Sequence, residues 1–375
     1  MQRLPVGIQS FGMIREHNLV YVDKTKQIYD LVTGKMGYYF FLSRPRRFGK
    51  SLLVSTLKEL FHGNRQLFES LWIAQSDYNW QEHHVIHLDF STISSRSSKE
   101  FHTNFSWEFD QIATQWNIDV SKAATAESKF KTLVTQLAQS KKVVLLIDEY
   151  DRPLLQHVTN IALMKEIQAI MSDFYATVKA MGAKISFLFM TGVTKFSKTS
   201  VFSGMNNLID LTLSIDAANL LGYTDAEIDH YFQPHIEEIA KAQRTTINEV
   251  KNSIKHWYNG YQFSKAPQTV YNPFSVLMYL QTKDLRNYWF ETGTPTFLVN
   301  LIKAKQYNIE DLDHAEIHID SLASFEIETM RLIPLLLQTG YLTIKSYNND
   351  TRNYQLGYSN EEQRNVSGWI AKEIR

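Results

Sequence analysis

The chain has no cysteine among its 375 residues. Disulfide bonds, thiolate metal sites and a cysteine nucleophile are therefore excluded, and this composition fits a reducing compartment. Long apolar runs are also missing. No stretch approaches the length that spans a membrane, and Met1 to Ile14 lack the apolar centre of a signal peptide. We therefore expect a soluble, cytoplasmic protein that has no membrane partner.

An excess of charge of one sign is absent as well, because 39 lysines and arginines balance 39 aspartates and glutamates. No overall field attracts the chain to nucleic acid, so any such contact needs a local patch. The length is sufficient for two domains with sizeable cores. No internal repeat or low-complexity linker is evident in it.

A basic loop stands between a predicted strand and a predicted helix. Residues 38–42 are aromatic and apolar and predict a buried strand, whereas apolar residues recur at helical spacing over 52–61. The loop between them reads Ser43-Arg44-Pro45-Arg46-Arg47-Phe48-Gly49-Lys50-Ser51. A strand, a tight loop and a helix N-terminus in this order bind anions, because backbone N–H groups and the helix dipole converge there.

This loop is typical of a P-loop, which binds the phosphates of a nucleotide. Gly49 allows the backbone to approach a phosphate, Lys50 can reach the terminal phosphates, and the Ser51 hydroxyl can ligate Mg²⁺. We predict that the loop from Arg44 to Ser51, together with Leu52, binds the nucleotide. The usual pattern has glycine in place of Arg44, so a basic surface turn that opens an ordinary helix is the alternative.

A second stretch weighs against that alternative. Residues 143–147 are apolar and predict a central strand of a parallel sheet, and Asp148 and Glu149 follow directly. Ligands of open α/β sheets lie beyond the carboxyl ends of the strands, so we expect Lys50 and Asp148 to converge from neighbouring strands. Asp148 can hold Mg²⁺, directly or through water, and Glu149 can orient and polarise the attacking water. A solvated acidic turn is the competing interpretation.

Further elements follow from hydrophobic periodicity. Strands are predicted at 85–90, 184–190 and 208–213, and helices at 100–116, 127–139 and 161–181. A short helix is expected after Asp23 or Thr25, either of which can cap it. His87 and Asp89 share one face of a strand, where satisfied polar groups at a strand end are favoured over a metal pair or a catalytic dyad.

The combination of motifs resembles the predicted AAA-ATPase-like family of prokaryotic P-loop proteins. The resemblance extends from about Phe11 to about Asn360, and in this family the loop typically reads Arg-Pro-Arg-Arg-Phe-Gly-Lys, so the missing glycine is a family trait. The stretches that carry it, besides the loop, are Tyr21-Val22-Asp23-Lys24-Thr25, Val85-Ile86-His87-Leu88-Asp89-Phe90-Ser91, Leu146-Ile147-Asp148-Glu149-Tyr150-Asp151, Gly222-Tyr223-Thr224 and Trp257-Tyr258-Asn259-Gly260-Tyr261.

The resemblance implies an ATPase that uses ATP and Mg²⁺, with an AAA-like parallel sheet flanked by helices. In ATPases with an added central strand, a polar residue after that strand senses the terminal phosphate. Thr191 is the candidate here, with Thr194 and Lys195 as alternates, and an ordinary strand exit is an equal alternative. Two other functions stay open: a nucleotide-gated binding module with little catalysis, and a small-molecule kinase.

No arginine finger is evident, so slow hydrolysis that acts as a switch is expected. Arg46, Arg47 and Arg152 are candidates for that role, within one chain or between subunits of an oligomer. The family also implies nucleic acid or a nuclease partner, which no residue of this sequence establishes.

We expect the ATPase domain at 1–217 and a mostly helical lid, or a winged-helix-like domain, at 218–375. Capping boxes at 224–227 and 246–249 and the pair Asn272-Pro273 signal helix starts, and 332–342 is apolar at helical spacing. A turn between 341–345 and 354–358 predicts a hairpin. Four aromatic residues around Gly260 are expected to pack the lid against the P-loop core rather than to stack on a base. They are Trp257, Tyr258, Tyr261 and Phe263.

Members of this family often carry a C-terminal nuclease-like domain of the PD-(D/E)XK type. Its chemistry needs an acidic pair and a lysine that converge on a metal ion. We find no such set on a credible hairpin after Tyr341, and the chain stops at Arg375. We therefore expect that the nuclease-like domain is missing and that its activity does not transfer to this chain.

Overall fold

The computed structural model describes residues 1–196, 205, 207–291, 309–322 and 332–374. Its N-terminal part contains a five-stranded sheet with the order β2-β3-β4-β1-β5, and all its strands are parallel. The strands are β1 (Tyr39–Ser43), β2 (His84–Asp89), β3 (Val143–Asp148), β4 (Ile185–Gly192) and β5 (Ile209–Asp210). The five predicted strands are confirmed, although β5 is only two residues long.

The order of the strands corrects one expectation. Because β4 lies between β1 and β3, Lys50 and Asp148 do not come from neighbouring strands. Strand order depends on pairings between distant segments, which local sequence patterns do not encode. The two residues still follow strands whose carboxyl ends lie at one edge of a parallel sheet.

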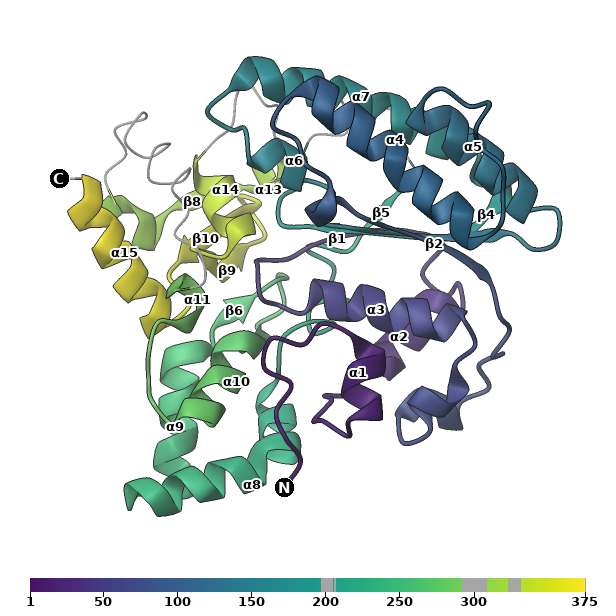
Figure 1. Ribbon diagram of the computed structural model, residues 1–375. Helices are drawn as coiled ribbons and strands as arrows, with labels where there is room; N and C mark the ends of the chain where they lie inside the picture. The colour runs from purple at the N-terminus through teal and green to yellow at the C-terminus, as the bar shows by residue number, and fades with distance from the viewer. Residues whose placement is uncertain (197–204, 206, 292–308, 323–331, 375) are drawn as a thin grey trace.

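Both faces of the sheet are covered by helices (Figure 1). Phe40 and Leu42 of β1 point into the core formed with α1 to α3, whereas Phe41 points into the core formed with α4, α5 and α7. Burial on both faces explains why the strands are continuous apolar runs. The helices of this part are α1 (Phe11–Glu16), α2 (Thr25–Val32), α3 (Lys50–Phe61), α4 (Ser98–Gln115), α5 (Ala126–Leu137), α6 (Arg152–Leu155) and α7 (Ile161–Ala180), with short 3-10 turns η1 (Arg65–Phe68), η2 (Trp72–Gln75), η3 (Phe90–Thr92) and η4 (Gly182–Lys184).

Neither predicted residue caps α2. Lys24 occupies the N-cap position and its side chain makes no capping hydrogen bond. The Asp23 carboxylate instead accepts hydrogen bonds from the backbone N–H groups of Thr25 and Trp72, at 2.8 and 2.7 Å. Asp23 therefore joins α2 to η2, which is a long-range contact that the local pattern could not indicate.

The C-terminal part, which we call the C-terminal unit, comprises residues 218–374 and is mostly helical. Both capping boxes are confirmed, at Thr224 and Thr246, and Asn272 caps the helix that begins with Pro273. Its helices are α8 (Asp225–Gln243), α9 (Ile247–Tyr258), α10 (Pro273–Thr282), α11 (Tyr288–Glu291), α13 (Ile319–Leu322), α14 (Leu332–Thr339) and α15 (Glu361–Ile374), with the 3-10 turn η5 (Ile309–His314).

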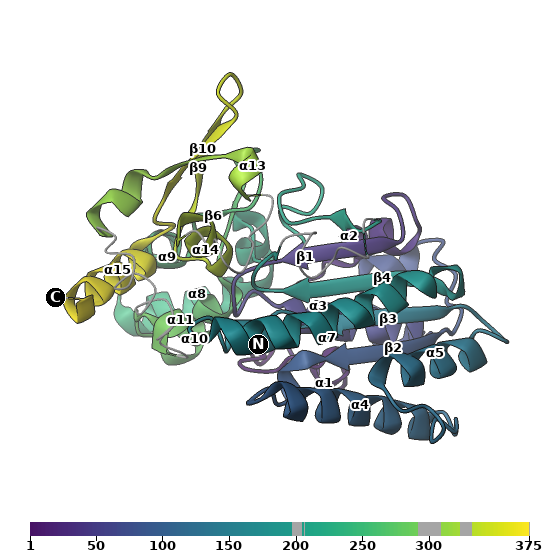
Figure 2. The same cartoon turned by 90° about the horizontal axis from the view of Figure 1, so that it is seen from above.

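Two small antiparallel sheets complete the unit, with the orders β8-β10-β9 and β6-β7. The predicted hairpin is confirmed as β9 and β10, and it projects from the body of the molecule (Figure 2). The strands are β6 (Tyr261–Gln262), β7 (Thr269–Val270), β8 (Glu316–His318), β9 (Thr343–Asn348) and β10 (Asn353–Gly357). Within the described ranges, no helix is long and apolar enough to cross a membrane. The boundary between residues 217 and 218 stays a prediction.

Candidate functional site

The predicted phosphate loop joins β1 to α3. Gly49 precedes α3 with φ of 90°, a left-handed conformation that favours glycine. Lys50 is the first residue of α3, and its ammonium group donates to the carbonyl oxygens of Arg44 and Pro45, each at 3.0 Å. The lysine side chain therefore lies along the inside of the loop, next to the helix N-terminus.

Lys50 is 6% exposed and lies near three carboxylates. Burial lowers the pKa of its ammonium group, and Asp148, Glu149 and Asp151 act in the opposite direction. A buried cation with only backbone carbonyls as hydrogen-bond acceptors is under-compensated, so an anionic ligand at this place would be stabilised.

Asp148 ends β3 and is buried beside the first turn of α3. Burial raises the pKa of its carboxyl group to about 6, while a hydrogen bond with Ser51 and the charge of Lys50 oppose this rise. Asp89 of β2 lies in register with Asp148 and raises the pKa further. The structure thus brings together Lys50, Ser51 and Asp148, which the sequence predicted to converge.

Few side chains near Lys50 and Asp148 could act as metal ligands. In the part of the chain that the structure describes, no group of three or more histidine, aspartate or glutamate side chains is placed to hold a metal ion. Mg²⁺ is commonly held by one or two carboxylates together with phosphate oxygens and water. The Ser51 hydroxyl and the Asp148 carboxylate therefore fit Mg²⁺ that arrives with a nucleotide.

Glu149 lies next to this group in a strained backbone conformation, with φ of 48°. Its carboxylate accepts a hydrogen bond from Arg152 at 3.1 Å. Both side chains of this ion pair are partly exposed, at 32% for Glu149 and 46% for Arg152. Such pairs contribute about 0–1 kcal/mol, so Glu149 can leave Arg152 at little cost.

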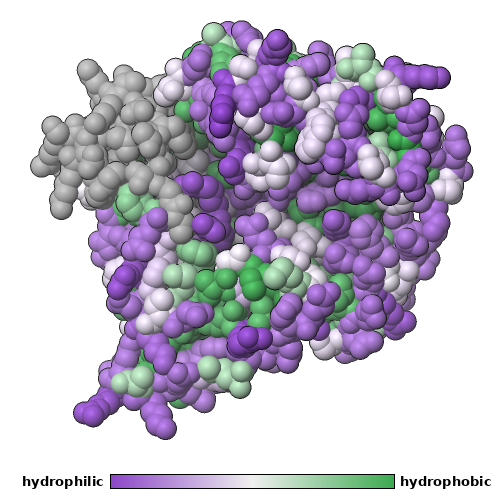
Figure 3. All heavy atoms as spheres, viewed as in Figure 1, coloured by the Kyte–Doolittle hydropathy of each residue, from purple (hydrophilic) through white to green (hydrophobic). Residues whose placement is uncertain are grey.

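A cleft of about 330 Å³ extends from this polar group. One end is formed by loop residues with Lys50, Ser51 and Glu149, and the other is largely apolar. In Figure 3 an apolar area faces the viewer between the positions of α10 and α3. The residues at the other end are Pro5, Gly7, Ile8, Gln9, Tyr223, Pro273, Phe274 and Leu277. No sequence pattern indicated that segment 5–9 lines the cleft, because its position depends only on the path of the folded chain.

Thr191, the predicted phosphate sensor, has another partner in this structure. Its buried hydroxyl donates to the Leu42 carbonyl oxygen of β1 at 2.8 Å. Thr191 is not among the described residues that line the cleft. The alternate Thr194 donates to the Asp151 carboxylate at 2.7 Å. The sensor role of Thr191 therefore stays a prediction.

Arg44 explains why the loop has no glycine at this position. Its side chain is fully buried, and the guanidinium donates to the carbonyl oxygens of Ser43, Thr212 and Ala217 at 2.8–2.9 Å. It also lies 4.2 Å from the centre of the Phe263 ring. Burial lowers the pKa of Arg44 to about 9, and Asp210 opposes this shift. Arg44 thus faces the protein interior, so only its backbone stays available as part of the phosphate loop.

The next loop residues also contact the C-terminal unit. A Cβ atom at Gly340 would approach Pro45 to 2.7 Å, so glycine permits this close packing. The Arg46 carbonyl oxygen accepts a hydrogen bond from the indole Nε1–H of Trp289 at 3.0 Å. These contacts join segments that are hundreds of residues apart, and sequence reasoning missed them.

Aromatic contacts continue along the loop. The Arg47 guanidinium lies 4.6 Å from the centre of the Phe274 ring. Phe48 packs edge-on against Tyr261 and Phe263, with ring centres 4.8 and 5.3 Å apart. The expectation that the aromatic cluster packs on the P-loop core is thus confirmed for Tyr261 and Phe263.

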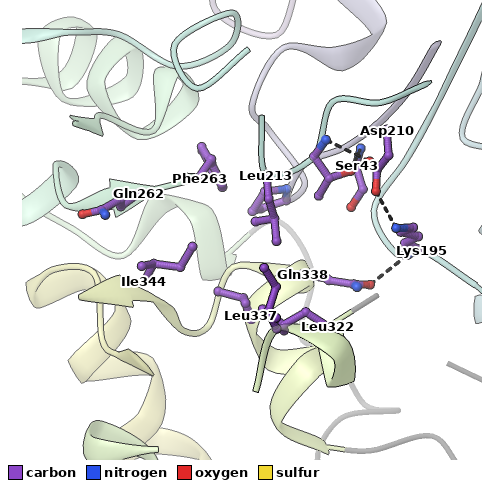
Figure 4. Close-up of a pocket in the computed structure, with 13 residues that line it drawn as sticks. Ser43, Lys195, Asp210, Leu213, Gln262, Phe263, Leu322, Leu337, Gln338 and Ile344 are labelled. Carbon is purple, nitrogen blue, oxygen red and sulfur yellow. Dashed lines mark hydrogen bonds and ion pairs between the residues drawn. The ribbon is translucent and has the colours of Figure 1, made fainter. Parts of the chain in front are cut away.

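A second cavity of about 210 Å³ lies behind the loop, between the sheet and the C-terminal unit (Figure 4). Lys195 points toward Asp210 and forms an ion pair with it, and its backbone N–H donates to Gln338 of α14 at 2.8 Å. Most other residues of the wall are apolar, such as Leu337. The alternate sensor Lys195 therefore points into this cavity, where its charge is already paired.

The parallel sheet, the glycine-lysine-serine loop at a helix N-terminus and the adjacent acidic strand end define an α/β P-loop protein. Its family is identified by sequence: a model described as "Predicted AAA-ATPase" matches residues 5–202. The chain therefore belongs to the predicted AAA-ATPase family, a class of ATP-binding P-loop proteins, as the motifs indicated.

Two individual proteins are similar to this chain. The "uncharacterized protein in vnfD 5′ region" of Azotobacter chroococcum mcd 1 is 36% identical over 353 residues, which are 92% of this chain and 64% of that protein. The chain thus spans less than two thirds of this relative's length. Among solved structures, the Walker-type ATPase PABY2304 of Pyrococcus abyssi has a TM-score of 0.47 and 12% identity, over 93% of this chain and 96% of the other.

Proposed function

We propose that the protein binds ATP with Mg²⁺ at the P-loop and hydrolyses it slowly, as a conformational switch. The arrangement of Lys50, Ser51 and Asp148 carries this proposal. A buried ammonium group, a hydroxyl and a buried carboxylate meet at a helix N-terminus, which is the set that a magnesium-bound triphosphate requires. Nucleic acid or a nuclease partner as the target of the switch stays a prediction from the family resemblance.

Each residue has a separate task in this proposal. Lys50 exchanges its two carbonyl partners for phosphate oxygens. Ser51 and Asp148 hold Mg²⁺, which neutralises charge that develops during phosphoryl transfer. Glu149 leaves its ion pair with Arg152, orients the attacking water and accepts its proton.

The apolar end of the cleft fits the base and ribose. A smaller cavity of about 70 Å³ lies beside Gly49 and Leu52 and continues this end, since it shares Pro5, Tyr223 and Pro273 with the cleft. Tyr21 and Val22 also line it, so the segment around residue 21 lies close to the predicted base position. Most ligand pockets combine an apolar wall with a few placed polar groups.

A second candidate function is a nucleotide-gated module with little turnover. One observation favours it: the Arg47 guanidinium lies against the Phe274 ring, so Arg47 must move before it can contact a phosphate. The partly exposed ion pair between Glu149 and Arg152 is too weak to prevent turnover by itself. Binding and turnover must therefore be measured side by side.

The test compares nucleotide binding and ATP turnover in the wild type, Lys50→Ala and Glu149→Gln. We expect Lys50→Ala to lose most nucleotide binding, because the cation between loop and phosphates is removed. Glu149→Gln should keep binding and lose turnover by roughly 100-fold or more, as is usual for removal of a general base. Lys26→Ala on α2 and the exposed Glu69→Gln serve as charge-matched controls.

The outcomes separate the candidates. Tight binding in the wild type with no turnover above the Glu149→Gln level would favour the gated module. Unchanged binding in Lys50→Ala together with unchanged turnover in Glu149→Gln would exclude both functions at this site.

A further inference from the structure

A polar pocket of about 350 Å³ lies in the C-terminal unit, where α9, β9 and the start of α15 meet. Figure 1 shows α15 beginning near α9. Among the described residues, none lines both this pocket and the nucleotide cleft. The pocket is therefore separate from the site assigned to ATP.

Basic side chains reach this pocket from three elements. Lys255 belongs to the last turn of α9, Lys345 to β9 and Arg364 to α15. Lys255 is already paired with Asp225, at 2.9 Å. For Lys345 and Arg364, the described part of the chain offers no carboxylate within ion-pair distance, so two positive charges lie here without a direct counter-charge.

Two charged groups act on Lys345. Partial burial lowers the pKa of its ammonium group, Asp313 opposes this, and Arg364 lowers the pKa by a smaller amount. The Asp313 carboxylate also accepts a hydrogen bond from the Tyr358 backbone N–H at 3.1 Å, and it makes no direct ion pair with Lys345. An anion between Lys345 and Arg364 would add the direct partner that both cations lack among the described residues.

The start of α15 adds a further favourable field. Ser359, Asn360 and Glu361 line the pocket, and α15 continues for 14 residues, so its positive end faces this region. One carboxylate opposes an anion here, since Glu361 lies at the rim, 3.7 Å from His256. Thr269 adds a neutral donor, whereas the Asn259 side-chain amide already donates to Asp225 at 3.5 Å.

We infer that this pocket binds a phosphate group, held between Lys345 and Arg364 at the start of α15. Two unpaired cations match the charge of a phosphate monoester or of inorganic phosphate. The Tyr358 ring is only 9% exposed, whereas the His256 side chain is 67% exposed, so among the described residues of the wall a base attached to the phosphate would find an open ring only at His256. The unpaired cations therefore assign recognition to the phosphate group itself.

The test is a calorimetric titration with inorganic phosphate of the wild type and of the double variant Lys345→Gln/Arg364→Gln. Titrations are repeated with ADP and Mg²⁺ present and in Lys50→Ala, so that binding at the P-loop is not counted. We expect saturable binding that survives both conditions and becomes roughly tenfold weaker or worse in the double variant, since two charge-assisted contacts are lost. The matched control, Arg96→Gln/Lys99→Gln, removes two positive charges from exposed positions before and at the start of α4, on the other part of the chain.

A second arm distinguishes a free phosphate from a nucleic-acid end. A short DNA strand is tested with and without a 5′-phosphate, and pocket-dependent preference for the phosphorylated strand would assign the group to a nucleic-acid end. Equal binding of the two strands, together with pocket-dependent binding of inorganic phosphate, would assign the site to a free phosphate. The inference is overturned if wild-type protein shows no saturable phosphate binding or if the double variant binds phosphate as the control does. None of these outcomes depends on whether the P-loop hydrolyses ATP.

Discussion

Arg44 and Lys50 are two buried cations of one loop, and their surroundings differ in an instructive way. The Arg44 guanidinium has three carbonyl partners and an aromatic ring, and it faces the C-terminal unit. The Lys50 ammonium has two carbonyl partners and nearby carboxylates, and it faces the cleft. One cation holds the loop in place, whereas the other is available to a ligand.

The same division holds for the loop as a whole. Its outer side packs against Phe263, Gly340 and Trp289, all from the C-terminal unit. Its inner side presents Lys50 and Ser51 to the cleft. A change in the loop upon nucleotide binding would therefore reach the C-terminal unit directly, without an intermediate element. Three predictions test this division.

The largest effect is expected for Arg44→Met. The substitution leaves three backbone carbonyls without their charged donor and should lower the free energy of unfolding by about 3 kcal/mol. Chemical denaturation measures this change in the free energy of unfolding. The exposed Arg96→Met, in the segment before α4, is the matched control and should change stability by less than about 0.5 kcal/mol. Equal effects of both substitutions would mean that the outer side of the loop is not what stabilises it.

Much of the phosphate loop could be predicted from sequence because its signals are local. The apolar strand, Gly49 before the helix and the acidic end of β3 lie in short stretches whose spacing reports secondary structure directly. The capping boxes at Thr224 and Thr246 are local in the same sense.

Apart from the packing of Tyr261 and Phe263 on the loop, the outer contacts could not be predicted in this way. Trp289 meets Arg46 across 243 positions of the sequence, and no pattern near either residue marks that pairing. The position of β4 between β1 and β3, and the bond from Thr191 to Leu42 that results from it, depend on which strands pair. The role of Arg44 likewise followed only from the partners that surround its side chain.

The second prediction concerns Glu362, which contacts Trp289, one of the residues on the outer side of the loop. Its fully buried carboxyl accepts hydrogen bonds from the Trp289 backbone N–H at 2.9 Å and from the Ser275 hydroxyl at 3.0 Å. Burial raises the pKa of Glu362 to about 8, against the lowering effect of these hydrogen bonds. Because the folded-state pKa is higher than the unfolded one, stability from this group is complete at acid pH and is lost as pH rises toward 8.

Glu362→Gln should therefore remove the loss of stability that accompanies rising pH. We expect little difference from the wild type at pH 4 and a gain of about 2 kcal/mol in the free energy of unfolding at pH 6, because pH 6 lies about 1.5 units above the ordinary glutamate pKa of 4.5 and each unit corresponds to about 1.4 kcal/mol. Denaturation at both pH values measures this gain, with the neighbouring, more exposed Glu361→Gln as the control. A gain at pH 4 that disappears at pH 6 would contradict the assigned direction of the shift.

The smallest effect is expected for Trp289→Phe, which separates the hydrogen bond to the loop from the packing around it. Phenylalanine keeps an aromatic ring beside Tyr341, whose ring centre lies 5.0 Å away, but it cannot donate to the Arg46 carbonyl. The loss of one neutral hydrogen bond predicts a destabilisation of about 1 kcal/mol.

If the outer contacts restrain the loop, the same substitution should also speed nucleotide release by a few-fold, measured as the dissociation rate of a fluorescent ATP analogue. The exposed Trp107→Phe, at 56% exposure, is the matched control for the change of side chain. Faster release together with unchanged stability would still support restraint of the loop by Trp289. Destabilisation with an unchanged release rate would instead mean that Trp289 only holds the C-terminal unit in place. Nucleotide binding on the cleft side of the loop would then be independent of the contacts on its outer side.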